Sequence, residues 1–230
     1  STSTYRLEEN ALSYLVSDRE LENADDVIQP DMDATDTLTH KFLLAKELDL
    51  AELMTTTQWS LRDSATAIWT SNTTTNEIIE DVMSLGTMII RNTGMRPTHI
   101  AFNDAAYVAA KNHTNVLNRI QQSERGIITA DILASIWDVK KVVVSYAAQN
   151  IGLEGPAVAN DSMTVVFPGH AWIGYVNPNP GPRKPSALYT FYARNMGADF
   201  VAKKWREERR GGDMIEVSNM YQHRVVASLC

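Results

Sequence analysis

Five histidines are the side chains in this chain best suited to metal binding or to proton transfer near neutral pH. They are dispersed, and none belongs to an H-E-x-x-H motif or another local ligand pair. Three of them could build the site of a soluble α/β enzyme if the fold brought them together, so this enzyme stays an alternative hypothesis. Dispersed histidines more often make an ordinary hydrogen bond at the surface or in the core. The five are His40, His99, His113, His170 and His223, and the enzyme hypothesis uses His99, His113 and His170.

Other signatures of catalysis or cofactor binding are missing from the sequence. It has no G-x-x-x-x-G-K-[ST] or G-x-G-x-x-G segment for phosphates and no serine in a G-x-S-x-G turn. The lone cysteine, Cys230, excludes an intrachain disulfide and a cysteine-based metal cage. Glu207 and Glu208 are adjacent, so on a helix or a strand their carboxylates point in different directions and do not form an acid–base pair. We therefore expect no enzyme activity, no cofactor and no metal.

A charged segment from Lys203 to Asp213 carries both signs of charge around a glycine turn. Arginine forks bind carboxylates through two parallel hydrogen bonds, which suits pairing between copies of the chain. A tryptophan inside the charged run offers an apolar anchor for such a contact. A solvated hairpin would have the same sequence and would contribute little, but we favour the contact interpretation. The candidate contact residues are Trp205, Arg206, Glu207, Glu208, Arg209 and Arg210.

A second candidate contact is the loop from Asn177 to Pro185, which contains four prolines. Proline fixes the backbone dihedral φ, so a proline-rich loop loses little entropy when it docks. A rigid surface loop without a partner is an equally good interpretation. The candidate contact residues in this loop are Pro178, Pro180, Pro182 and Arg183.

Composition predicts a soluble, folded chain with a sizeable core, because 44% of the 230 residues are apolar. There is no apolar run of about 18 residues and no signal-peptide pattern at the start, so we expect no membrane partner. The formal net charge is −7, but residues 1–54 contain thirteen acidic and four basic residues, and the remainder has a small positive excess. Such asymmetry would let copies attract one another, and a solvated acidic face is an equally good interpretation. A strongly acidic surface argues against tight wrapping of nucleic acid.

The elements that must position these residues are mainly helices in the first half. A weak helical period over Tyr5 to Glu20 predicts a first helix. Pro30 predicts an extended approach to an N-cap at Asp33, followed by a long amphipathic helix from Ala34 to about Met54. The next segment, 55–73, is expected to be a connector anchored by Trp59 and Trp69.

The rest of the chain alternates helices with strands and then becomes mainly strand. A capping box at Thr74 to Glu77 predicts a helix that Gly94 closes. Asn103 or Asp104 is expected to cap one short helix, and Thr129 another. The expected strands are Thr98 to Phe102, Lys141 to Ala147, Met163 to Phe167, Ala171 to Val176, Leu188 to Arg194, Val201 to Glu207 and Met214 to Ala227.

The order of these pieces resembles the major capsid protein of tailed bacteriophages, with the Hong Kong 97-type shell fold that encapsulins share. The resemblance rests on four segments in sequence order, which together cover nearly the whole chain. They are Tyr5 to Glu20 ahead of the long helix; Ile78 to Met95 running into Arg-Pro-Thr-His-Ile-Ala-Phe-Asn103; Leu133-Ala-Ser-Ile-Trp-Asp-Val-Lys-Lys-Val-Val-Val-Ser145; and Ala171-Trp-Ile-Gly-Tyr-Val176 before the proline-rich loop.

The resemblance implies an α+β fold with a peripheral domain and an axial domain. Residues 1–33 would be the end of the extended-loop and N-terminal region, and residues 34–74 the spine helix and connector of the peripheral domain. Residues 75–195 would form the axial domain, a mixed sheet flanked by helices, and residues 196–230 the strands that return to the peripheral domain.

The implied function is structural. Copies would form hexamers and pentamers of an icosahedral phage head, assembled in the cytoplasm of the bacterial host, around double-stranded DNA held without sequence specificity. Portal and decoration proteins are the other implied partners, and an encapsulin-like compartment is the nearest alternative. The chain lacks most of the family's N-terminal arm and extended loop, and it ends within an expected strand. We therefore expect it to be part of a longer subunit and carry over no cross-linking.

Overall fold

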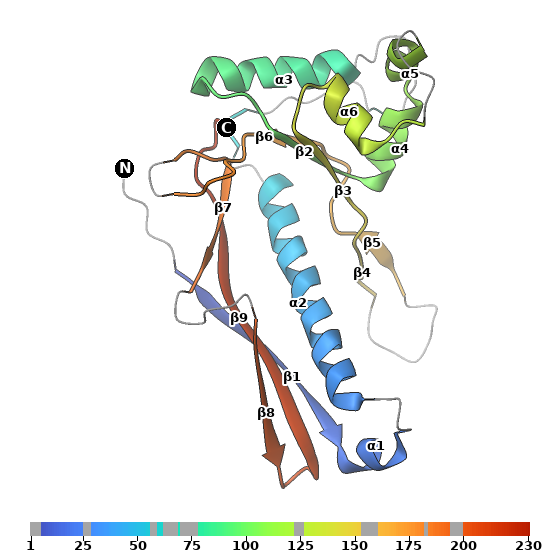
Figure 1. The fold of residues 1–230 in the computed structure, drawn as a ribbon, viewed down its shortest axis with the longest axis vertical. Helices are drawn as coiled ribbons and strands as arrows, with labels where there is room; N and C mark the ends of the chain where they lie inside the picture. The colour runs from blue at the N-terminus through green and yellow to red at the C-terminus, as the bar shows by residue number, and fades with distance from the viewer. Residues whose placement is uncertain are drawn as a thin grey trace. The chain divides into compact units, whose positions relative to one another are not determined.

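A computed structural model describes most of the chain, and it divides into two compact units (Figure 1). Unit 1 comprises Ser1–Asp49 and Thr190–Arg224, and unit 2 comprises Leu50–Tyr189 and Val225–Cys230. The described residues are 6–24, 29–55, 59–61, 69, 78–121, 127–152, 161–181, 184–193 and 200–230.

Unit 1 is built from a long helix and a mainly antiparallel sheet with the strand order β1-β9-β7, in which β8 also pairs with β9. The first half of α2 places Ala34, Leu38 and Phe42 on one face at four-residue spacing, and all three are buried. They pack with three buried strand residues, Val16, Ile215 and Val217. The elements are β1 (Glu8–Ser17), α1 (Asp18–Asn23), α2 (Pro30–Thr55), β7 (Leu188–Tyr192), β8 (Val201–Glu207) and β9 (Gly212–Val225), of which α2, β7 and β9 continue into unit 2.

The helix predicted over residues 5–20 is wrong, because most of that segment is strand β1. Ten consecutive residues pair antiparallel with β9, from Glu8 opposite Tyr221 to Ser17 opposite Gly212. Tertiary pairing overrides the weak helical period here. The helix that does exist, α1, begins after a capping box in which Ser17 and Glu20 each accept a hydrogen bond from the other's backbone N–H.

Helix α2 is confirmed, but its predicted start is wrong. It begins at Pro30, where a missing N–H costs nothing because the first amides of a helix have no intrahelical partner. The amides of Met32 and Asp33 donate to the carbonyl of Gln29, at 3.0 and 3.1 Å. Asp33 therefore lies inside the first turn and does not cap it.

Unit 2 contains a three-stranded sheet of order β3-β2-β6, with helices α3 to α6 gathered around it, and a separate two-stranded ribbon, β4-β5 (Figure 1). Strand β2 is parallel to β3 and antiparallel to β6. The buried Ile100 and Phe102 of β2 pack in one core with Ile78 of α3 and Leu133 of α6. The elements are α3 (Ile78–Thr93), β2 (His99–Asn103), α4 (Asp104–Asn112), α5 (Thr114–Gln121), α6 (Ala130–Ile136), β3 (Lys141–Ser145), β4 (Ala148–Asn150), β5 (Met163–Val165) and β6 (Trp172–Gly174).

Most local signals in unit 2 are confirmed. Gly94 follows α3 with a φ of 72°, in the left-handed region that glycine adopts without strain. Asn103 caps α4 by accepting a 2.9 Å hydrogen bond from the amide of Ala106. Thr129 is the N-cap residue of α6, as predicted, but its side chain makes no capping hydrogen bond. The capping box of residues 74–77 lies outside the described residues.

The two tryptophans of the connector pack inside unit 2, as predicted. Trp59 meets Trp172 edge to face, with ring centroids 5.6 Å apart. Trp69 stacks on Trp137 and meets Phe102 edge to face, both at 6.3 Å. These contacts anchor the described parts of the connector to the core of unit 2.

Candidate assembly surfaces

The charged segment forms the β8–β9 hairpin of unit 1. All seven residues of β8 pair with β9, from Val201 opposite Ser218 to Glu207 opposite Gly212. At the turn, the amides of Arg210 and Gly211 both donate to the carbonyl of Glu207 at 3.1 Å, and Gly211 has a φ of 61°. The turn signal of the paired glycines is therefore confirmed: Gly211 closes the turn and Gly212 begins β9.

Arg206 is held by a carboxylate of its own chain. Its guanidinium binds Asp18 through two bonds, Nη1 to Oδ1 at 2.5 Å and Nη2 to Oδ2 at 2.6 Å. Nη1 also approaches Oδ1 of Asp213 at 3.4 Å. Lys204 lies beside this group and binds Asp213 at 3.0 Å and Asp31 at 2.5 Å. These five residues, which we call the hairpin ion cluster, tie the hairpin to the starts of α1 and α2.

The pairing within the cluster shifts the pKa values of Asp18, Asp213 and Lys204 toward their charged forms. The hydrogen bond from Arg206 lowers the pKa of Asp18, and the hydrogen bond from Lys204 lowers the pKa of Asp213. In the reverse direction, Asp31 and Asp213 raise the pKa of Lys204. Because four of these five side chains are 37–47% exposed, their pairing contributes more to positioning the hairpin than to stability.

The remaining hairpin candidates differ in accessibility. Trp205 is 39% exposed, and it points to the face opposite Lys204 and Arg206 because strand residues alternate. Glu208, Arg209 and Arg210 are exposed at the turn, and Glu207 is half-buried. Within the described residues, Arg209 and Arg210 form no ion pair. The structure therefore leaves Trp205 and the turn free to meet a partner, while Arg206 has its acid within the chain.

Among the described residues of the proline loop, 178–180 are exposed, Pro178 and Pro180 included, and hydrogen bonds hold residues on both sides of positions 182–183. The amide of Asn177 donates to Ser186 Oγ at 3.3 Å, and Tyr189 donates its hydroxyl proton to the carbonyl of Lys184 at 2.8 Å. Two candidates, Pro182 and Arg183, lie outside the described residues.

The histidines of the enzyme hypothesis do not gather into a site. His99 is half-buried, its Nδ1 lies 2.9 Å from Thr98 Oγ1, and burial lowers its pKa. His113 is buried and accepts a hydrogen bond from the amide of Asn115, while His170 is exposed in a loop. No three His, Cys, Asp or Glu side chains in the described part of the chain are placed to hold a metal ion.

Across the described ranges, no helix is both long enough and apolar enough to cross a lipid bilayer. The longest described helix, α2, has charged residues throughout its length.

Sequence comparison finds a similar phage protein. No protein-family model matches the chain. It is 28% identical over 102 residues to the major capsid protein of Burkholderia phage BcepMu, a match covering 42% of this chain and 31% of that protein. The chain thus spans less than a third of that relative's length.

Two solved structures share the fold over almost the whole chain. A phage-related protein from Bordetella bronchiseptica RB50 is 25% identical, with a TM-score of 0.79, covering 98% of this chain and 74% of that one. The capsid structure of cyanophage P-SCSP1u is 14% identical, with a TM-score of 0.54, covering 97% and 70%. The α+β fold class is confirmed: the chain has the Hong Kong 97-type fold of phage capsid proteins and resembles a phage major capsid protein in sequence.

Proposed function

We propose that this chain is the shell-forming part of a phage major capsid protein. The observation that carries the proposal is a capsid fold over nearly the whole chain, combined with sequence identity to a phage major capsid protein. In this role the protein is structural and non-enzymatic, and copies assemble into hexamers and pentamers that close an icosahedral head. The identity to a phage protein favours this shell over an encapsulin-like compartment.

Each of the two compact units is proposed to correspond to one domain of the shell subunit. We assign unit 1, with most of α2 and the β1-β9 sheet, to the peripheral domain, and unit 2 to the axial domain. This assignment moves the boundaries of the sequence-based one, since the helix–sheet unit takes residues 1–49 together with 190–224.

The hairpin turn and the proline loop are the proposed contacts between copies. Trp205, Arg209 and Arg210 support the first, because they are exposed at or beside a hydrogen-bonded turn. Glu208 accompanies them, and Arg206 and Glu207 hold the hairpin in shape. Pro178 and Pro180, with Pro182 and Arg183 beyond the described residues, are the proposed contacts of the loop.

The proposed cargo is double-stranded DNA confined mechanically. A chain of net charge −7 is poorly suited to releasing the counterions of DNA over a large surface, so confinement needs no sequence-specific contact. Portal and decoration proteins complete the proposed partners, and the virion, assembled in the bacterial host cytoplasm, is the proposed location.

Negative-stain electron microscopy of the purified full-length protein tests the proposal. We expect closed shells or capsomers of uniform size at moderate salt. Monodisperse monomers across a range of salt and protein concentrations would contradict it. Shells that recruit a cargo peptide, and no DNA, would point to the encapsulin-like alternative. Stoichiometric zinc, or catalytic turnover that His→Ala changes abolish, would favour the enzyme.

A further inference from the structure

Strands β4 (Ala148–Asn150) and β5 (Met163–Val165) of unit 2 form a two-stranded sheet of their own. Together with the flanking residues 146–147, 151 and 161–162, they make up what we call the β4–β5 ribbon. Ala148 pairs with Val165 and Asn150 with Met163, in antiparallel register. Two backbone bonds of 2.9 Å extend the ladder, from Ile151 N to Ser162 O and from Val166 N to Ala147 O. Figure 1 shows the ribbon continuing from the end of β3, apart from helices α3 to α6 of the same unit.

Large apolar side chains with high exposure are concentrated in the ribbon. Across the described residues, six large apolar side chains are at least half exposed. Four of these six lie in the ribbon: Tyr146 at 68%, Met163 at 67%, Ile151 at 62% and Val165 at 52%. Single exposed apolar residues are ordinary, but a cluster on one element marks an interaction surface.

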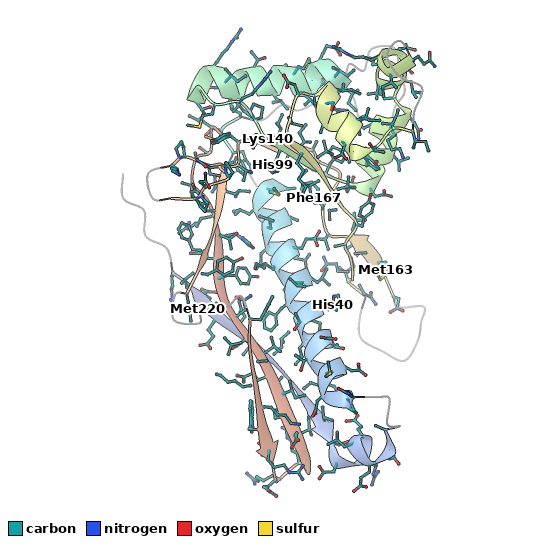
Figure 2. All side chains as sticks on the ribbon, in the orientation of Figure 1. His40, His99, Lys140, Met163, Phe167 and Met220 are labelled. Carbon is teal, nitrogen blue, oxygen red and sulfur yellow. The ribbon has the colours of Figure 1, made fainter. Side chains whose placement is uncertain are left out.

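Three of the four share one face. Residues opposite each other in an antiparallel pair, and residues two apart in a strand, point to the same side. Val165 is opposite Ala148, Met163 is two residues before Val165, and Tyr146 is two residues before Ala148. These three form a continuous apolar strip that runs diagonally across the strands, and Met163 is labelled on the ribbon in Figure 2.

The strip is nearly free of charge. Among the ribbon's described residues Asp161 alone is charged at neutral pH, and its Oδ1 accepts a 2.7 Å hydrogen bond from the side-chain Nδ2 of Asn150. Copies of a chain with net charge −7 repel one another overall, so close approach is least opposed where the surface carries no acids. The strip therefore complements a neutral surface of another copy better than it complements a basic partner.

Isolated two-stranded ribbons are marginally stable in water, and their open edges invite further pairing. Burying Tyr, Met and Val side chains against a neighbour would stabilise both the ribbon and the contact. We propose that the Tyr146–Met163–Val165 strip docks on a neighbouring copy of this chain and is covered in the assembled shell. This inference rests on the proposed function.

Site-specific photo-crosslinking tests the contact directly. A photoreactive phenylalanine analogue is placed at position 163 of the full-length protein and, as the matched control, at position 32, another methionine exposed to a similar extent (60%) but on α2. We expect irradiation of assembled protein to give chain–chain adducts from position 163, mapped by mass spectrometry, in at least about tenfold greater yield than after dilution to monomers.

The outcomes separate this inference from the proposed function. If electron microscopy shows shells but position 163 gives no adducts, the proposed docking of the strip is wrong and the proposed shell function still holds. Adducts without closed shells support the strip and count against the shell. Monomers without adducts overturn both, and adducts to a different protein overturn the strip as a contact between copies.

A double variant, Met163→Gln with Val165→Thr, provides a second measurement. It keeps strand-compatible side chains but removes apolar area, whereas Met32→Gln removes similar exposed area elsewhere. We expect the double variant to raise the concentration needed for half-assembly at least about tenfold more than Met32→Gln does, with an unchanged circular dichroism spectrum. Assembly of the double variant no worse than that of Met32→Gln would overturn the inference.

Discussion

At the scale of single residues, Gly174 is a position where unit 2 has no room for a side chain. A Cβ built there would lie 2.4 Å from the ring of Trp172 and 3.1 Å from the carbonyl oxygen of Cys230. The indole cannot easily move, because it is buried and packs against Trp59. By contrast, a Cβ at Gly169 would meet nothing within 4 Å.

We therefore expect Gly174→Ala to lower the free energy of unfolding by about 1–3 kcal/mol, the usual cost of overpacking. Gly169→Ala should change it by less than about 0.5 kcal/mol, as surface substitutions do. Urea denaturation of both variants, followed by tryptophan fluorescence, measures the difference. Equal stabilities would mean that β6 shifts to accommodate the methyl group.

The hairpin ion cluster predicts a pH dependence. The folded-state pKa values of Asp18 and Asp213 are lowered, so their stabilising effect is complete above the unfolded-state value of 3.8 and is lost as the pH falls through the folded values. Arg206→Met should reduce stability at pH 7, and its difference in unfolding free energy from the unchanged protein should shrink as the pH falls below 3.8 and the two carboxylates take up protons.

The matched control is Arg209→Met, which removes an exposed arginine without an ion pair among the described residues. It should leave the unfolding curve unchanged at every pH. Urea unfolding of dilute protein from pH 2.5 to 7 measures both variants. A deficit of Arg206→Met that stays constant through the acid range would show that the cluster is not its source.

The sequence revealed the charges of this site but not their pairing. Arg206 stood out because it lies in a run of mixed charge beside a glycine turn. Its acid, Asp18, lies 188 positions away in the sequence. The two meet because β1 and β8 flank β9, and long-range strand pairing of this kind has no local signature. Arg206, which the sequence suggested as a contact with another copy, thus binds Asp18 of its own chain.

At the scale of elements, helices α4 and α6 offer a comparison of two caps. Asn103 is buried and its side chain accepts a hydrogen bond from the amide of Ala106, whereas Thr129 is exposed and makes no side-chain bond. Asn103→Ala should cost about 1 kcal/mol of unfolding free energy, the typical contribution of an N-cap. Thr129→Ala should cost less than about 0.5 kcal/mol.

Thermal or urea unfolding measures this pair, and the ratio is more informative than either value alone. If both variants lost the same stability, the capping bond of Asn103 would contribute nothing beyond its burial. Circular dichroism would show whether α4 itself frays in Asn103→Ala.

Elements were predictable where local signals were strong. Gly94, Asn103 and the valines of β3 gave correct boundaries within a few residues, because left-handed turns, caps and β-branched runs act locally. Strand β1 was missed because its apolar residues happen to recur at helical spacing. Its ten residue pairs with β9 leave no local signal in the sequence. The Ser17-Asp-Arg-Glu20 capping box could have revealed α1, since both of its reciprocal bonds form.

At the scale of the whole molecule, the order of elements was sufficient to indicate the fold, but the composition of the units was not. Unit 1 joins the first 49 residues to Thr190–Arg224, and no change in composition marks that junction. The join depends on the hydrophobic pairing of α2 with β9, through Leu38, Phe42 and Ile215. Contact between distant segments follows from such packing, which periodicity alone does not specify.

Charge reversal at the hairpin turn tests whether electrostatics guides the assembly. Arg209→Glu with Arg210→Glu changes two exposed side chains and spares Arg206, which the fold uses. We expect these arginines to be attracted to the acid-rich residues 1–54 of neighbouring copies. We expect the double variant to assemble at least about tenfold less well at low salt, with the circular dichroism of the monomer unchanged.

Reversal of an exposed arginine on α3, Arg91→Glu, controls for the change in net charge. Because exposed charges are screened over about 8 Å at physiological ionic strength, added salt should narrow the gap between the double variant and the unchanged protein. Light scattering against protein concentration, at low and high salt, gives the assembly midpoint of each. Normal shells from the double variant would remove the hairpin turn from the list of contacts and leave the apolar strip of the β4–β5 ribbon to provide specificity.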